Sequence, residues 1–158
     1  MVTSPVQPLH DSLQAELSLV ERFLVALQAE AQALAQPDQD TALTAGTHEK
    51  QLCLELLQQA GQAREAALVQ LGHTPDHDGL RAATQSPPTL RALADTLLQR
   101  AALARELNQA NGRLIEAHLQ HVHNSLNTLH GLHQGSALYD ASGRARSLSP
   151  QGTRITAG

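Results

Sequence analysis

Histidine is the residue type in this sequence most suited to chemistry, and five of the nine histidines lie in HLQHVHNSLNTLHGLH, residues 118–133. Imidazole groups bind transition metals and exchange protons near neutral pH. His118 with His121, and His130 with His133, have a three-residue spacing that lets two ligands on one helix reach the same ion. A metal site is therefore the first function to weigh against the rest of the sequence.

The histidines of this segment do not converge on one point. On a helix that turns about 100° per residue, His118 and His121 fall at one edge of the local apolar residues, and His123 and His130 fall at the other. Metal sites in helical bundles also use Glu-x-x-His pairs from facing helices, and the chain contains no Glu-x-x-His. We expect structural or solvated histidines and neither a native metal nor a cofactor, although such pairs can bind adventitious nickel or zinc.

Other candidates for catalysis or ligand binding are weaker. PDHDG, residues 75–79, imitates the start of a calcium loop but lacks the alternating oxygen ligands and the closing glutamate. Cys53 lacks the cationic setting that activates a thiol, and it is expected to be a small core residue. A phosphate-cradling glycine loop and a Ser/His/Asp signature are both missing from the sequence. We therefore expect a protein that is not an enzyme.

Composition argues against nucleic acids and membranes as partners. The chain has 158 residues, a net charge of −4, no tryptophan, and one residue each of phenylalanine and tyrosine. It therefore offers neither a basic surface for phosphates nor aromatic side chains for stacked bases. The longest stretch without formal charge, residues 117–139, is too rich in His, Asn and Gln for membrane insertion. The opening residues do not resemble a signal peptide, so we expect a cytoplasmic protein.

The spacing of leucine and alanine predicts helices throughout the body of the chain. The first helix is expected from about Asp11 to Leu34, with Asp11 as the N-cap and Gln14 completing a capping-box pattern. Its apolar residues recur at intervals of three and four, which is the spacing of a coiled coil rather than of a strand.

Two more helices are expected. The second covers about residues 41–71 and ends at Gly72, but Gly46 inside it favours a kink or fraying. A connection follows, with one short helical turn near residues 80–84. The third helix begins at the prolines 87 and 88 and reaches almost to Gly135, a length on the order of 65 Å at 1.5 Å per residue.

These elements predict an all-α fold, an elongated antiparallel bundle or hairpin of three main helices with a very long last helix. Residues 1–134 form the helical domain. Residues 135–158 are rich in Gly, Ser, Pro and Arg and have few large apolar groups, so we expect a disordered tail.

Within the long helix, ELNQANGRLIEAHL, residues 106–119, combines Asn108, Asn111 and Gly112 with the apolar spacing. A buried amide needs a partner, and glycine weakens a helix. These residues make the helix less stable. We therefore expect them to set the register of the helix, to allow close packing against a neighbour, or to bend the helix. It can be an ordinary polar layer that sets register or part of a functional surface.

This segment, the long helix after it and a tail containing LYDASGR together resemble the FlgN family of flagellar export chaperones. The family's Asn-x-x-Asn-Gly-x-Leu-Ile block is matched by Asn108, Asn111, Gly112, Leu114 and Ile115. Tyr139 followed by Gly143 matches the tail of the family. More loosely, EKQLCLELL, LVQLG and GLRAA resemble the middle helix and the short turn after it, so that the resemblance runs from about residue 9 to residue 143.

The resemblance implies a cytoplasmic α-helical chaperone that binds the hook–filament junction proteins FlgK and FlgL. It places substrate capture on the last part of the long helix and docking to the export gate protein FlhA on Tyr139. The helix length favours the same division independently, because its last turns would outrun a bundle and leave apolar side chains uncovered. The expected substrate-binding residues are Leu114, Ile115, Leu119, Val122, Leu126, Leu129 and Leu132.

A different class of protein would use the same residues. A generic coiled-coil scaffold, or a protein that dimerises with its own copy, would cover these leucines with a second chain of the same kind.

Overall fold

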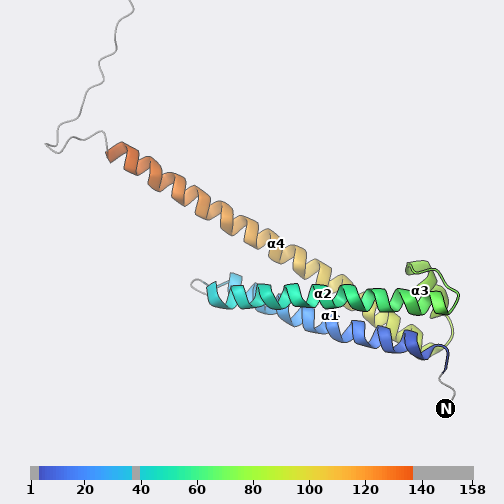
Figure 1. Ribbon diagram of the computed structural model, residues 1–158. Coiled ribbons are helices and arrows are strands. Elements are labelled where there is room, and N and C mark those ends of the chain that lie inside the picture. Colours follow the sequence, from blue (N-terminus) through green and yellow to red (C-terminus); the bar gives the residue numbers. More distant parts are fainter. Residues whose placement is uncertain (1–3, 37–39, 137–158) are drawn as a thin grey trace, which may run out of the picture. The chain divides into compact units, whose positions relative to one another are not determined.

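A computed structural model of the chain describes residues 4–36 and 40–136, and for residues 40 and 132–136 it describes only the backbone. Within these ranges the chain forms four α-helices and no strand: α1 (Gln7–Leu34), α2 (Asp40–Gln70), α3 (His77–Ala83) and α4 (Pro88–Ser136) (Figure 1). The predicted all-α fold with a very long last helix is confirmed. Across the described ranges, none of the helices combines the length and apolar character needed to cross a membrane.

Helix α1 begins earlier than the sequence pattern predicted. Val6 occupies the N-cap position without a side-chain cap, and a proline lies in the first turn. Asp11 is therefore inside the helix, where its carboxylate accepts a hydrogen bond of 2.8 Å from the Gln7 amide. The predicted N-cap at Asp11 is wrong, because a first-turn proline needs no N–H partner and the fully buried Leu9 already belongs to the helix.

Helix α2 is continuous through Gly46, where a kink or fraying was expected. Its last residue is Gln70, and Gly72 caps the C-terminus as predicted, with a φ of 81° in the left-handed conformation that glycine adopts most easily. The amides of Gly72 and His73 donate to the carbonyls of Val69 and Leu68, both at 2.9 Å. This pair of bonds is the Schellman pattern, which satisfies carbonyls at a helix end.

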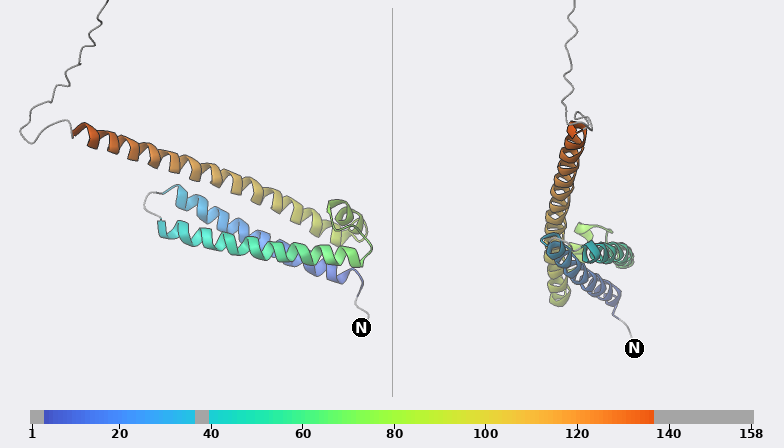
Figure 2. Two further views of the ribbon diagram at one scale, coloured as in Figure 1. Left: turned by 45° about the horizontal axis from the view of Figure 1, so that its top comes forward. Right: turned by 90° about the vertical axis from the view of Figure 1, so that its left-hand side faces the viewer.

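The chain divides into two compact units, Met1–Ile115 and Glu116–Gly158. In the first unit, α1 and α2 lie side by side as an antiparallel hairpin (Figures 1 and 2). Ion pairs follow this antiparallel order: Arg64 with Glu16 at 2.8 Å near one end and Lys50 with Glu30 at 2.9 Å near the other.

The part of α4 that belongs to the first unit follows α1 in the same direction. Arg100 pairs with Glu21 at 2.9 Å, and eleven residues further along α4 the Asn111 amide reaches the carbonyl of Leu27. One core joins this part of α4 to the other helices. Its largest buried members are Leu9, Leu13, Val20, Phe23, Leu24, Leu27, Leu68, Leu80, Leu90 and Leu97.

Helix α3 is held to the connecting segment that follows α2 by a cap and a close approach. The Asp76 carboxylate accepts hydrogen bonds from the Gly79 amide (2.8 Å) and the Thr74 hydroxyl (2.7 Å). A Cβ atom at Gly79 would lie 1.8 Å from the carbonyl oxygen of Thr74. Only glycine fits this position without movement of the backbone.

Candidate functional site

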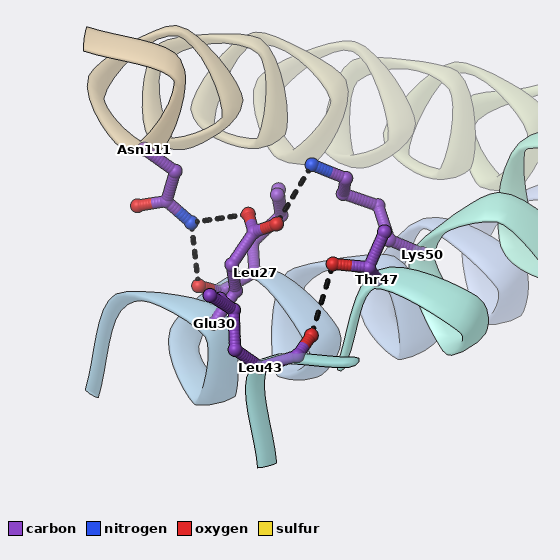
Figure 3. A network of polar contacts seen from close by, with 6 residues as sticks. All are labelled: Leu27, Glu30, Leu43, Thr47, Lys50 and Asn111. Atoms are coloured by element: carbon purple, nitrogen blue, oxygen red, sulfur yellow. Dashed lines mark hydrogen bonds and ion pairs between the residues drawn. The ribbon is translucent and has the colours of Figure 1, made fainter. Parts of the chain in front are cut away.

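A buried polar network links three helices in the first unit (Figure 3). The Asn111 side-chain nitrogen on α4 donates to the backbone carbonyl of Leu27 (2.8 Å) and to Oε2 of Glu30 (2.9 Å), both on α1. Lys50 on α2 donates to Oε1 of the same glutamate at 2.9 Å. Glu30 is completely buried and Asn111 nearly so, whereas Lys50 keeps about a fifth of its side chain exposed.

This network fixes how the three helices are aligned. In the part of the chain that the structure describes, every buried side-chain N or O atom has a hydrogen-bond partner. A shift of α4 along α1 by one turn would break both bonds of Asn111 and leave the Glu30 carboxylate with fewer donors, at a cost of about 1–3 kcal/mol for each unsatisfied group. The contact therefore favours one register, as a polar layer in a coiled coil does.

Sequence reasoning missed two members of this network. Glu30 lies three residues after the buried Leu27, so it falls within the apolar spacing of α1, where an acid needs a buried counter-ion. Lys50 is the only lysine in the chain. Two features of the sequence could have indicated this ion pair: an acid within the apolar spacing of α1, and a single lysine on the next helix.

The other residues of the Asn–Gly block have different surroundings. Asn108 is half-buried, whereas Gly112 is exposed. A Cβ atom at Gly112 would have no described heavy atom within 4 Å beyond its own helix backbone. Close packing therefore does not explain Gly112 in the described structure. Helix α4 continues through it without interruption.

The predicted substrate-binding residues at the end of α4 are exposed. Within the second unit, every residue from Glu116 to Gly131 is exposed. Leu119, Val122, Leu126 and Leu129, called here the α4 stripe, retain between 43% and 61% of their accessible surface. These residues recur at intervals of three and four, so one side of the helix carries all of them.

The other predicted binding residues lie before and after the α4 stripe. Leu114 is 52% exposed and Ile115 is half-buried, both at the end of the first unit. Leu132 lies in α4, but only its backbone is described. Tyr139, the predicted docking residue, lies outside the described residues.

The polar side of this part of α4 is neutral. Glu116 is the only residue with a formal charge from 116 to 131. The hydroxyls of Ser125 and Thr128 donate to backbone carbonyls one turn earlier, at 3.0 and 2.9 Å. Because these hydroxyls are bonded to their own helix, the surface next to the α4 stripe offers mainly amides and imidazoles to a partner.

The histidines of this helix form no metal site in the described structure. His118, His121, His123 and His130 are all exposed. Among the side chains that the structure describes, those of residues 4–36 and 41–131, no group of three or more His, Cys, Asp or Glu is placed to hold an ion.

Cys53 has the surroundings of a core residue. Its side chain is fully buried, and its thiol donates to Oε1 of Glu49 at 3.7 Å. Burial, followed by the nearby Glu49 carboxylate, raises the pKa of the Cys53 thiol above its ordinary value. A raised pKa keeps the sulfur protonated and a poor nucleophile near neutral pH.

Comparison with known proteins gives one assignment. A family model described as FlgN protein matches residues 1–147. Neither a curated protein nor a solved structure gives a significant match to the chain.

Proposed function

Because this chain belongs to the FlgN family, whose members are flagellar export chaperones, we propose that it captures the hook–filament junction proteins FlgK and FlgL in the cytoplasm. It then delivers them to the export gate protein FlhA. The α4 stripe, together with Leu114, Ile115 and Leu132, is the proposed capture surface.

The exposure of the α4 stripe is the observation that supports this proposal. Single exposed leucines are common on protein surfaces, but four large aliphatic side chains along one side of eleven residues form a continuous apolar strip. Fully burying a side chain of this size contributes about 1.5–3 kcal/mol. Because these side chains retain about half of their accessible surface, a partner that covered the strip would gain part of this free energy at each of the four positions.

The geometry of the strip favours a helical partner. Its side chains recur at the three- and four-residue intervals that match the ridges and grooves of another helix. An amphipathic segment of the exported protein would present the complementary spacing, which is the helix-in-groove mode of recognition. Covering that segment before export would also shield its own apolar face from aggregation.

A second site is proposed in the tail. Residues 1–134 would act as the capture domain and residues 135–158 as a docking segment, with Tyr139 as its anchor. Tyr139 is the only tyrosine of the chain, and Leu138 stands beside it in a polar sequence. A short aromatic anchor gives the modest affinity that release at an export gate requires.

A pull-down with purified FlgK tests the capture surface. Leu126→Asp with Leu129→Asp is expected to abolish binding, because both carboxylates would be buried without counter-ions. The matched control is Val25→Asp with Val69→Asp, which places the same charges at exposed aliphatic positions on α1 and α2. Circular dichroism must show equal helicity for both variants. Unchanged capture by the Leu126 and Leu129 variant would refute this location of the site.

Self-association is the competing function, since a second copy of the chain could cover the same strip. Light scattering over a range of protein concentrations, with and without FlgK, distinguishes a chaperone from a self-associating scaffold by the mass of the complex. A chaperone would yield a complex with FlgK in place of any dimer, whereas a scaffold would stay dimeric in its presence.

A further inference from the structure

Two of the four described histidines of this helix, His118 and His130, border the α4 stripe. At about 100° per residue, His118 lies about 20° beyond Leu129 on one side of the strip. His130 lies about 20° beyond Leu119 on the other side. His121 and His123 lie further out on the same two sides. A helix laid on the strip would touch His118 and His130, and His121 would stay about 80° beyond Leu129.

His118 also continues a series of buried positions. Residues seven apart lie on the same side of a helix that packs in the coiled-coil manner. In the first unit Leu90, Leu97, Ala104 and Asn111 follow this spacing, and all four are buried. His118 is the next position of the series and is exposed. A partner that packed on the second unit in the same manner would bury the His118 imidazole.

The lack of charged residues beside the α4 stripe indicates what kind of partner surface fits it. In the first unit, helices meet through ion pairs such as Arg100 with Glu21 and Arg64 with Glu16. Residues 117–131 contain no Asp, Glu, Lys or Arg. At about 100° per residue, Arg113 falls opposite the strip, whereas Glu116 lies about 60° beyond Leu119 and three residues before the strip begins. A charged side chain on the contact face of a partner would therefore find no counter-ion among residues 117–131.

We propose that the α4 stripe takes an amphipathic helix whose contact face carries no formal charge, and that capture requires neutral histidines at its edges. This inference rests on the proposed function and adds the class of partner segment and a pH response. An imidazole changes charge between pH 5 and 8. Burying a charged imidazole is costly, so covering the strip favours the neutral form of the histidines at its edges. Acidification therefore releases the partner.

The groups that could alter this response lie on α4 itself. Every residue from Glu116 to Gly131 is exposed. Within residues 117–131 the titratable side chains are the four histidines, and Glu116 is the carboxylate that precedes them.

Calorimetry of the full chain with purified FlgK at about pH 7.5 and about pH 5.5 tests the inference. Affinity is expected to fall by at least about tenfold at the lower pH, since each proton that must be lost contributes up to tenfold per pH unit. Replacing His118, His121, His123 and His130 by Gln keeps polar side chains at the four positions. At both pH values this variant is expected to bind within about threefold of the affinity that the wild type shows at about pH 7.5.

His48→Gln is the matched control, because His48 is an exposed histidine of α2 in the first unit. It should retain the full pH response of the wild type. Circular dichroism at both pH values must show unchanged helicity, which separates release from unfolding. Binding at high ionic strength should be nearly unchanged, because no ion pair is expected at the strip.

The outcomes separate this inference from the proposed function. Equal wild-type affinity at both pH values, or an undiminished pH response in the fourfold His→Gln variant, would overturn the pH response. A strong loss of affinity in high salt would overturn the uncharged contact face. Failure of the wild type to bind FlgK at about pH 7.5 would instead overturn the proposed function, and the inference with it. A pH-dependent dimer that excludes FlgK would identify a second copy as the occupant.

Discussion

The Asn111 side-chain nitrogen donates to Glu30 across 2.9 Å between two helices that are far apart in sequence, and both side chains are buried. Glu30 also accepts from Lys50, so α1, α2 and α4 share one polar contact. Asn111 therefore helps to align the first part of α4 with the hairpin of α1 and α2.

Replacing Asn111 by Ala is expected to lower the free energy of unfolding by about 1–3 kcal/mol, because the buried Glu30 carboxylate loses a donor. Urea unfolding followed by circular dichroism measures the change. Asn127→Ala is the control, since Asn127 is exposed on the same helix. Equal stability of the two variants would show that the buried bond contributes nothing.

Lys50→Met is expected to be more damaging, at about 3 kcal/mol, because it leaves a fully buried carboxylate without its cation. Adding Glu30→Gln to that variant should recover part of the loss, since the glutamine removes the unpaired charge. A double-mutant cycle from urea unfolding measures the coupling. Additive losses from the two substitutions would contradict a direct interaction.

Gly46→Ala is expected to stabilise the protein by about 0.5–1 kcal/mol, since glycine is unfavourable inside a helix. The new Cβ would lie 3.9 Å from the Cα and Cβ atoms of Glu30, which is an ordinary contact. Gly79→Ala is the opposite case, because its Cβ would overlap the Thr74 carbonyl, and it should destabilise α3. Melting temperatures that move in the same direction for both would disprove this reading.

Asp76 should make the stability of α3 depend on pH. The Gly79 amide, followed by the Thr74 hydroxyl, holds the pKa of the Asp76 carboxyl below its ordinary value of 3.8. A lowered folded-state pKa means that the stabilisation is present above 3.8 and is lost as pH falls through the lower value. Thermal unfolding should therefore show a gap between the wild type and Asp76→Ala at neutral pH that narrows in strong acid. Asp76→Asn keeps a hydrogen-bond acceptor but has no ionisable group, so its melting temperature should change less with pH than that of the wild type.

Tyr139→Ala is expected to weaken binding to FlhA while leaving FlgK binding unchanged, because the two proposed sites lie on different segments. Calorimetry with each partner measures the two effects, with Leu148→Ala as a control for loss of another apolar side chain from the tail. Equal losses for both partners would show that the two sites are not separate.

Periodicity alone predicted the long helices, because leucines at intervals of three and four leave little choice of local structure. Gly72 was also predictable as a cap, since a helix that ends with a left-handed residue favours glycine. The start of α1 was not, because the capping pattern at Asp11 competes with a first turn that contains Pro8 and buries Leu9. Local capping rules carry about 1 kcal/mol, and core burial outweighs them.

The candidate site divides in the same way. The spacing of Leu119, Val122, Leu126 and Leu129 predicted one apolar side of α4, and the length of the predicted helix indicated that this side would be exposed, as it is. The partner of Asn111 was not predictable, because Glu30 and Lys50 come from two other helices and their meeting depends on how these pack. Single-helix patterns identify faces, whereas contacts between helices require the fold.

The contact between Lys50 and Glu30 has a practical consequence for finding partners. Lys50 is the only lysine of the chain, and its ammonium group is held by a buried carboxylate. Amine-reactive cross-linkers would therefore find no lysine on α4 and one largely buried lysine on α2, so a proteomic search that depends on them would sample partners of α4 poorly. Photoactivatable amino acids introduced at positions along α4 are the reagents suited to trapping what binds there.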